Sequence, residues 1–116
     1  MGVEHTNLID ATIARVVREY GNERCRLMRR EVGKFQRGPR WISVNPKGTA
    51  DLEGIVLVSG IPMFFCLEVK IRPDKLKKDQ LTRQRELRKL NVIYEEITDV
   101  SFEADIERFF KLVDNC

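Results

Sequence analysis

The hydrophobic pattern at the start of the chain predicts one helix followed by two strands. Apolar residues recur every three or four positions from Val3 to Tyr20, as on one buried helical face, and Gly21-Asn22 supplies a stop. The next segment, Cys25 to Val32, mixes apolar and polar residues in a way that indicates a strand. We expect a basic loop over Gly33–Pro39 and a short second strand over Trp41–Val44.

The middle of the chain predicts a tight β-hairpin. Asn45-Pro46-Lys47-Gly48 is a strong turn signal. Two β-rich runs follow, Leu52–Val58 and Met63–Ile71, and Ser59-Gly60 joins them as a short turn. Pro62 cannot donate a ladder hydrogen bond, so a register slipped by one residue stays open.

The last third of the chain changes period from two to about 3.6. Beyond Pro73 we expect a helix over Lys75–Leu90, a strand over Val92–Ile97 and a closing amphipathic helix whose apolar stripe runs from Phe102 to Val113. The predicted order is α-β-β-β-β-α-β-α. It is typical of an α/β fold in which helices flank one mixed sheet, here as a single domain over residues 1–116.

Composition narrows the class of protein. The chain has no run of 18 apolar residues and no basic-then-apolar leader, so we expect neither a membrane span nor secretion. The three cysteines, Cys25, Cys66 and Cys116, are widely spaced and form no CxxC pair, which favours free thiols in an intracellular compartment. His5 is the only histidine, so a Ser/His or Cys/His catalytic pair has one candidate base.

Charge is concentrated in two segments, although the net charge is only +3. Residues 24–40 hold seven basic side chains and one acidic, and residues 69–90 hold nine basic and three acidic, so each balance is +6. Such segments suggest a surface that faces a polyanion. A solvated charged helix and strand would give the same pattern, and both interpretations stay open.

A cluster of charged residues lies in the predicted hairpin. Glu68 and Lys70 share one face of an otherwise apolar strand, about 7 Å apart at about 3.4 Å per residue. Counting back from the turn places Asp51 opposite Glu68, and such pairs have Cβ atoms about 5 Å apart. Carboxylates this close repel each other unless a cation joins them, and Mg²⁺ bound by one or two carboxylates suits phosphodiester hydrolysis. A surface Glu-Lys ion pair, worth at most about 1 kcal/mol, is the structural alternative.

The hairpin residues resemble a known nuclease motif. Gly48-Thr49-Ala50-Asp51-Leu52-Glu53-Gly54, followed by Phe65-Cys66-Leu67-Glu68-Val69-Lys70, resembles the split PD-(D/E)XK motif, with Ala50 in place of the usual proline. Over residues 4–100 the chain is similar to a stand-alone VRR-NUC (virus-type replication-repair nuclease) domain. Further landmarks are Glu4, the Arg29–Gly33 segment and Lys78-Asp79-Gln80-Leu81.

The resemblance implies a restriction-endonuclease-like fold and a role for each matching residue. Asp51, Glu68 and the backbone carbonyl of Val69 become metal ligands, and Lys70 becomes the catalytic lysine. Gln80 would approach the active site, and Glu4 would support the metal. A carboxylate favoured by the helix dipole in a first turn is the alternative for Glu4.

The activity implied by the resemblance is Mg²⁺-dependent, structure-selective endonuclease cleavage of branched DNA, with Mn²⁺ as a substitute cation. A homodimer that resolves four-way (Holliday) junctions is expected, since a two-fold enzyme places two active sites on two strands. Aromatic residues of Met63–Phe65 or of the closing helix are candidates for the dimer surface, with core packing as the alternative. The residues expected to bind DNA phosphates are Arg29, Arg30, Lys34, Arg37, Arg40, Lys75, Lys77, Lys78 and Arg83.

Other functions stay open at this point. Trp41 is a candidate for base stacking, or else a core residue. A nucleic-acid-binding module of the same fold without catalysis is the main alternative to the nuclease. A restriction-type nuclease is a third, although 116 residues show no inserted recognition segment.

Overall fold

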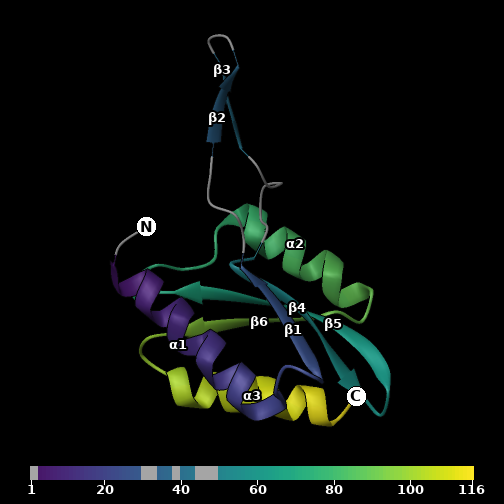
Figure 1. Ribbon diagram of the computed structural model, residues 1–116. Helices are drawn as coiled ribbons and strands as arrows, with labels where there is room; N and C mark the ends of the chain where they lie inside the picture. The colour runs from purple at the N-terminus through teal and green to yellow at the C-terminus, as the bar shows by residue number, and fades with distance from the viewer. Residues whose placement is uncertain (1–2, 30–33, 38–39, 44–49) are drawn as a thin grey trace.

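Three helices and a four-stranded mixed sheet make up the body of the protein, seen here in a computed structural model (Figure 1). The structure describes residues 3–29, 34–37, 40–43 and 50–116, and it describes side chains for 3–29 and 50–116. The elements, in chain order, are α1 (Val3–Tyr20), β1 (Cys25–Arg29), β2 (Lys34–Arg37), β3 (Arg40–Ser43), β4 (Leu52–Val58), β5 (Ile61–Lys70), α2 (Lys78–Lys89), β6 (Ile93–Thr98) and α3 (Phe102–Asp114).

The main sheet has the strand order β1-β4-β5-β6, in which β1, β4 and β5 are antiparallel and β6 runs parallel to β5. Helix α2 provides the crossover between β5 and β6. The predicted turn is confirmed, because Ser59 and Gly60 both have positive φ angles, 52° and 79°, as a two-residue type I′ turn requires. Val58 therefore pairs with Ile61, and Pro62 is accommodated opposite Leu57 without a slip.

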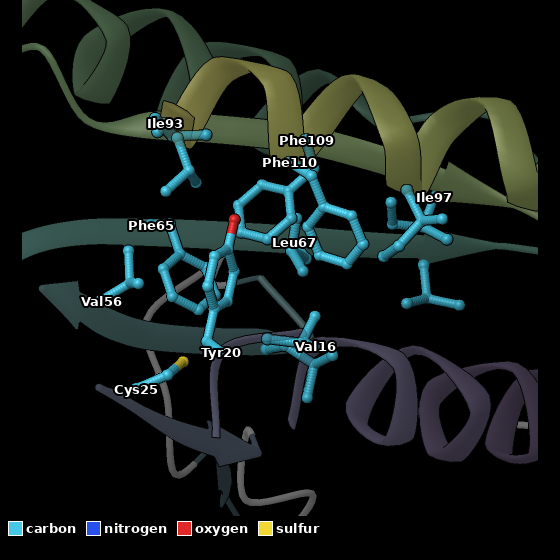
Figure 2. Close-up of a cluster of buried hydrophobic side chains, with 14 of the residues drawn as sticks. Val16, Tyr20, Cys25, Val56, Phe65, Leu67, Ile93, Ile97, Phe109 and Phe110 are labelled. Atoms are coloured by element: carbon cyan, nitrogen blue, oxygen red, sulfur yellow. The ribbon is translucent and has the colours of Figure 1, made fainter. Parts of the chain in front are cut away.

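The helices cover both faces of this sheet. Helices α1 and α3 enclose the larger core, where Tyr20 and Phe110 meet edge to face at 5.5 Å and Phe65 lies 5.0 Å from Phe109 (Figure 2). Helix α2 covers part of the opposite face, where a smaller cluster forms around Cys66. Phe65, Phe109 and Phe110 are thus core residues, which confirms the core-packing alternative for these three rings.

Strands β2 and β3 form a separate two-stranded ribbon that extends away from the body (Figure 1). The sequence predicted a loop across Gly33–Pro39, and that prediction is wrong for Lys34–Arg37, which pair with Arg40–Ser43. Lys34–Arg37 shows no alternation of apolar and polar residues, and for that reason the hydrophobic pattern did not predict a strand there. The element order accordingly has one more strand than predicted. The predicted turn at Asn45–Gly48 lies outside the described residues.

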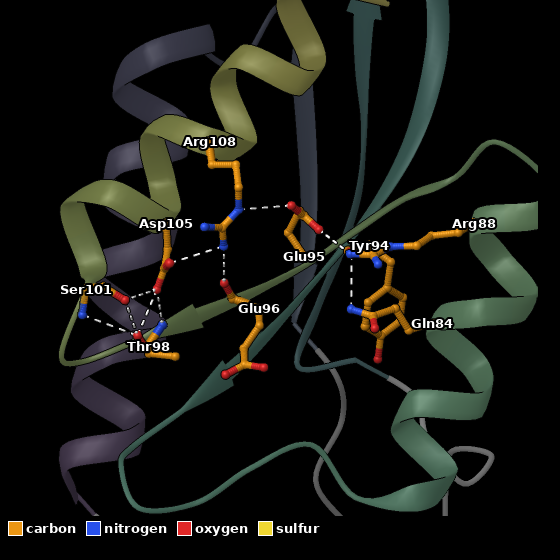
Figure 3. A network of polar contacts seen from close by, with 9 residues as sticks. All are labelled: Gln84, Arg88, Tyr94, Glu95, Glu96, Thr98, Ser101, Asp105 and Arg108. Atoms are coloured by element: carbon orange, nitrogen blue, oxygen red, sulfur yellow. Dashed lines mark hydrogen bonds and ion pairs between the residues drawn. The ribbon is translucent and has the colours of Figure 1, made fainter.

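The edge strand β6 is tied to the helices on both sides by ion pairs (Figure 3). The Glu95 carboxylate forms ion pairs with Arg88 of α2 and with Arg108 of α3, the latter with a nitrogen–oxygen distance of 3.2 Å. Asp105 of α3 accepts hydrogen bonds from the Thr98 backbone N–H at 2.9 Å and from its hydroxyl at 2.8 Å.

Within the described residues, no helix is both long and apolar enough to cross a membrane.

Candidate active site

The end of the β4–β5 hairpin opens into a cavity of about 540 Å³. Its lining residues are Glu4, His5, Asp51, Glu68, Lys70, Ile71, Asp74, Lys75, Lys77 and Gln80. The cavity therefore brings together residues from α1, the start of β4, the end of β5 and the beginning of α2. The sequence assigned five of these residues to one site, namely Glu4, Asp51, Glu68, Lys70 and Gln80, and all five line it.

Asp51 is buried at the entrance of β4. It is only 2% exposed, and its Oδ2 accepts a hydrogen bond from the Val69 backbone N–H at 2.9 Å. The ladder ends with Leu52 opposite Leu67, and one further step in the same register leads to Asp51 and Glu68, the pairing that the sequence predicts. A type I′ turn fixes this register, and the hairpin then delivers both carboxylates to one end of the sheet.

Glu68 is the second buried carboxylate, at 1% exposure. Its Oε1 accepts a hydrogen bond from Gln80 Nε2 at 2.9 Å and lies 3.7 Å from Lys70 Nζ. The Lys70 side chain is itself only 11% exposed. A buried carboxylate needs such partners, since an uncompensated buried charge costs several kcal/mol.

Gln80 joins the beginning of α2 to this carboxylate. Its Oε1 accepts a hydrogen bond from the Lys77 backbone N–H at 2.8 Å, while its Nε2 donates to Glu68. The first contact satisfies one of the N–H groups that a helix start leaves without an intrahelical partner. Because of this cap, α2 begins at Lys78 rather than at the predicted Lys75. Lys75 and Lys77 then lie before the helix, where they line the cavity.

His5 is the site residue that sequence reasoning missed. Its Nε2 lies 2.8 Å from the Val69 carbonyl oxygen and 3.4 Å from Asp51 Oδ2. A signal was present, because the buried residues of α1 are Ile9, Thr12, Val16 and Tyr20, and His5 continues that spacing by one turn. Glu4 is one residue out of step with this face and is exposed at the same cavity.

The smaller core under α2 borders the site. Burial, reinforced by the nearby Glu53 carboxylate, raises the pKa of the Cys66 thiol to about 12. Tyr94, on β6 beside Cys66, also has a raised pKa because of burial and then the charge of Glu68. Neither group ionises near neutral pH, so neither is suited to act there as a nucleophile or a base.

The predicted DNA-binding residues are only partly placed by the structure. Lys75, Lys77 and Lys78 are exposed beside the cavity. Arg29 pairs with Asp10 at 3.0 Å, and Arg83 lies 4.0 Å from Glu53. The side chains of Arg30, Lys34, Arg37, Arg40 and Trp41 lie outside the described residues.

Comparison with known proteins adds no assignment: no family model, no curated protein and no solved structure matches this chain.

Proposed function

We propose that this protein is a metal-dependent endonuclease that acts on branched DNA. The observation that carries the proposal is the placement of two buried carboxylates, Asp51 and Glu68, together with Lys70 in one cavity. Burying three charges at one point is costly for a fold, and active sites are where such costs are retained. The motif resemblance supports the same assignment independently of the geometry.

The donor set fits a hydrated hard cation. Mg²⁺ keeps several waters and binds proteins through one or two carboxylates, and Asp51 and Glu68 offer two beside the Val69 carbonyl. Within the described residues, no three His, Cys, Asp or Glu side chains are arranged to hold a metal ion. With two carboxylates and one carbonyl as ligands, such an ion would keep positions for water and for phosphate oxygens. When bound, it supplies charge stabilisation and a more acidic water.

The protein's own side chains would each contribute differently to binding or to cleavage. Lys70, beside Glu68, places a positive charge where a phosphoryl oxygen gains negative charge. Gln80 holds the Glu68 carboxylate in one orientation through its link to the helix cap. Lys75 and Lys77 hold the DNA backbone at the rim of the cavity, which is binding without base readout.

A panel of DNA substrates tests the proposal. We expect four-way junctions, flaps or splayed duplexes to be cut in Mg²⁺ or Mn²⁺, and cutting to cease in excess EDTA. Paired symmetric nicks in a junction, with a solution mass of twice 13.6 kDa, are expected if the active form is a homodimer. Cutting of linear duplex alone would contradict the preference for branched DNA, and full activity in EDTA would contradict metal dependence.

A DNA-binding module without catalysis is the second candidate. Lys75 and Lys77 beside the cavity would serve such a module as well, because holding phosphates needs no cation. The same panel separates the two functions, because a binding module retards branched DNA in a gel and cuts none of it under any metal condition.

A further inference from the structure

His5 makes contacts in the cavity that the proposed mechanism has not used. Its side chain is 16% exposed, and it is the only histidine in the sequence. Both oxygens that its Nε2 approaches, on Val69 and Asp51, belong to groups that would hold the cation. The Asp51 carboxylate is held in place from the other side by the Val69 backbone N–H.

The two distances match the spacing of ligands around one ion. Atoms bonded to one octahedral divalent cation at about 2.0–2.2 Å are about 2.8–3.1 Å apart at a right angle and farther apart as that angle opens. The distances from His5 Nε2 are 2.8 Å to the Val69 oxygen and 3.4 Å to Asp51 Oδ2. A hydrogen bond explains the first distance, but the second is longer than a good N–H···O bond. One shared cation would account for both.

We propose that His5 Nε2 is a ligand of the divalent cation, together with Asp51 and the Val69 carbonyl. The inference rests on the metal dependence of the proposed function and specifies its metal. Imidazole nitrogen suits first-row transition ions, whereas Mg²⁺ strongly favours oxygen. The site accordingly prefers Mn²⁺ to Mg²⁺, and His5 rather than Glu4 is the ligand that α1 provides.

Pulsed electron paramagnetic resonance of Mn²⁺ bound to the untagged protein tests this assignment. A coordinated imidazole gives a nitrogen coupling to the manganese, and with one histidine in the chain that coupling can come only from His5. We expect the coupling in the wild type and in the control variant Glu4→Gln. We expect it to be absent in His5→Gln, with Mn²⁺ affinity lowered at least tenfold and Mg²⁺ affinity lowered less.

The outcomes separate this inference from the proposed function when DNA cleavage is measured on the same samples. Bound Mn²⁺ without nitrogen coupling overturns the inference, and cleavage by that sample leaves the nuclease standing. An unchanged Mn²⁺ affinity in a folded His5→Gln variant also overturns it. A wild type that binds no divalent cation and cuts no DNA overturns both.

Discussion

Buried charges in this protein are held by specific partners, and Asp105 shows how. Burial alone would raise the pKa of this carboxyl, but hydrogen bonds from the Thr98 backbone and hydroxyl groups and from Ser101, with the charge of Arg108, lower it overall. Figure 3 shows these groups around the carboxylate. Since the charged form is favoured in the folded state, Asp105 stabilises the fold above its unfolded pKa and loses that effect as pH falls through the folded value.

Replacing this carboxylate tests the sign of that effect. At pH 7 we expect Asp105→Asn to lower the free energy of unfolding by about 1–3 kcal/mol, the usual cost of disrupting a buried hydrogen-bonded group. The difference from the wild type should shrink as the pH falls below about 4, the pKa of an aspartate in the unfolded chain, towards the lower pKa of the folded state. Urea unfolding at several pH values measures this. Asp114→Asn, an exposed change on the same helix, is the control, and equal effects of the two variants would contradict the account.

At the scale of helices and strands, local chemistry explains what the sequence could predict. The β4–β5 register was predictable because it depends on the two turn residues Ser59 and Gly60. The turn also allowed the sequence to predict that Asp51 and Glu68 lie at one end of the hairpin, where both line the same cavity. Strand β2 was missed because Lys34–Arg37 has a single apolar residue, Phe35, and so shows no alternation. The part played by His5 was missed because it depends on how α1 packs against β5, which the helical pattern alone does not specify.

Gly54 tests the packing of β4 against its neighbours. A Cβ atom at this position would lie 2.6 Å from the Arg26 carbonyl oxygen and 2.6 Å from Phe65 Cζ. Moving the Arg26 carbonyl would displace the backbone of a neighbouring strand, which is costly. We therefore expect Gly54→Ala to destabilise the protein by about 1–3 kcal/mol, beyond any effect of the substitution on backbone conformational freedom.

The matched control for that variant is Gly60→Ala in the hairpin turn. Its Cβ would meet nothing within 4 Å, but its φ of +79° strains any residue with a side chain. We expect a loss of about 1 kcal/mol there. Thermal and urea unfolding compare the two. If Gly54→Ala proved as stable as the wild type, the close approach of β1, β4 and Phe65 would be wrong.

For the whole molecule, the distribution of charge matters more than its net value of +3. The proposed site combines buried carboxylates, Asp51 and Glu68, with exposed lysines, Lys75 and Lys77, which suits both a cation and a phosphate backbone. Helices α1 and α3 enclose the larger core on one face of the sheet, and the first turn of α1 reaches the cavity with Glu4 and His5 (Figures 1 and 2). The proposed site therefore lies at one end of the sheet.

Salt dependence of DNA binding tests this polarity. Neutralising Lys75, Lys77 and Lys78 to glutamine should weaken binding to all DNA sequences alike. Each phosphate contact removed should reduce the slope of log affinity against log salt by about 0.9. Fluorescence anisotropy of a labelled junction measures this slope. Lys111→Gln on α3 is the control and should leave the slope unchanged, and an unchanged slope in the triple variant would place the DNA elsewhere.

The most direct test of the proposed function is the rate of junction cleavage by Glu68→Gln beside the wild type, with binding measured in the same samples. The substitution keeps the shape and a hydrogen-bonding oxygen but removes the charge that would hold a cation. We expect cleavage in Mg²⁺ or Mn²⁺ to fall by at least about 100-fold while junction affinity changes less than about threefold. Cleavage by Glu68→Gln at the wild-type rate would contradict the assignment of this cavity as the active site.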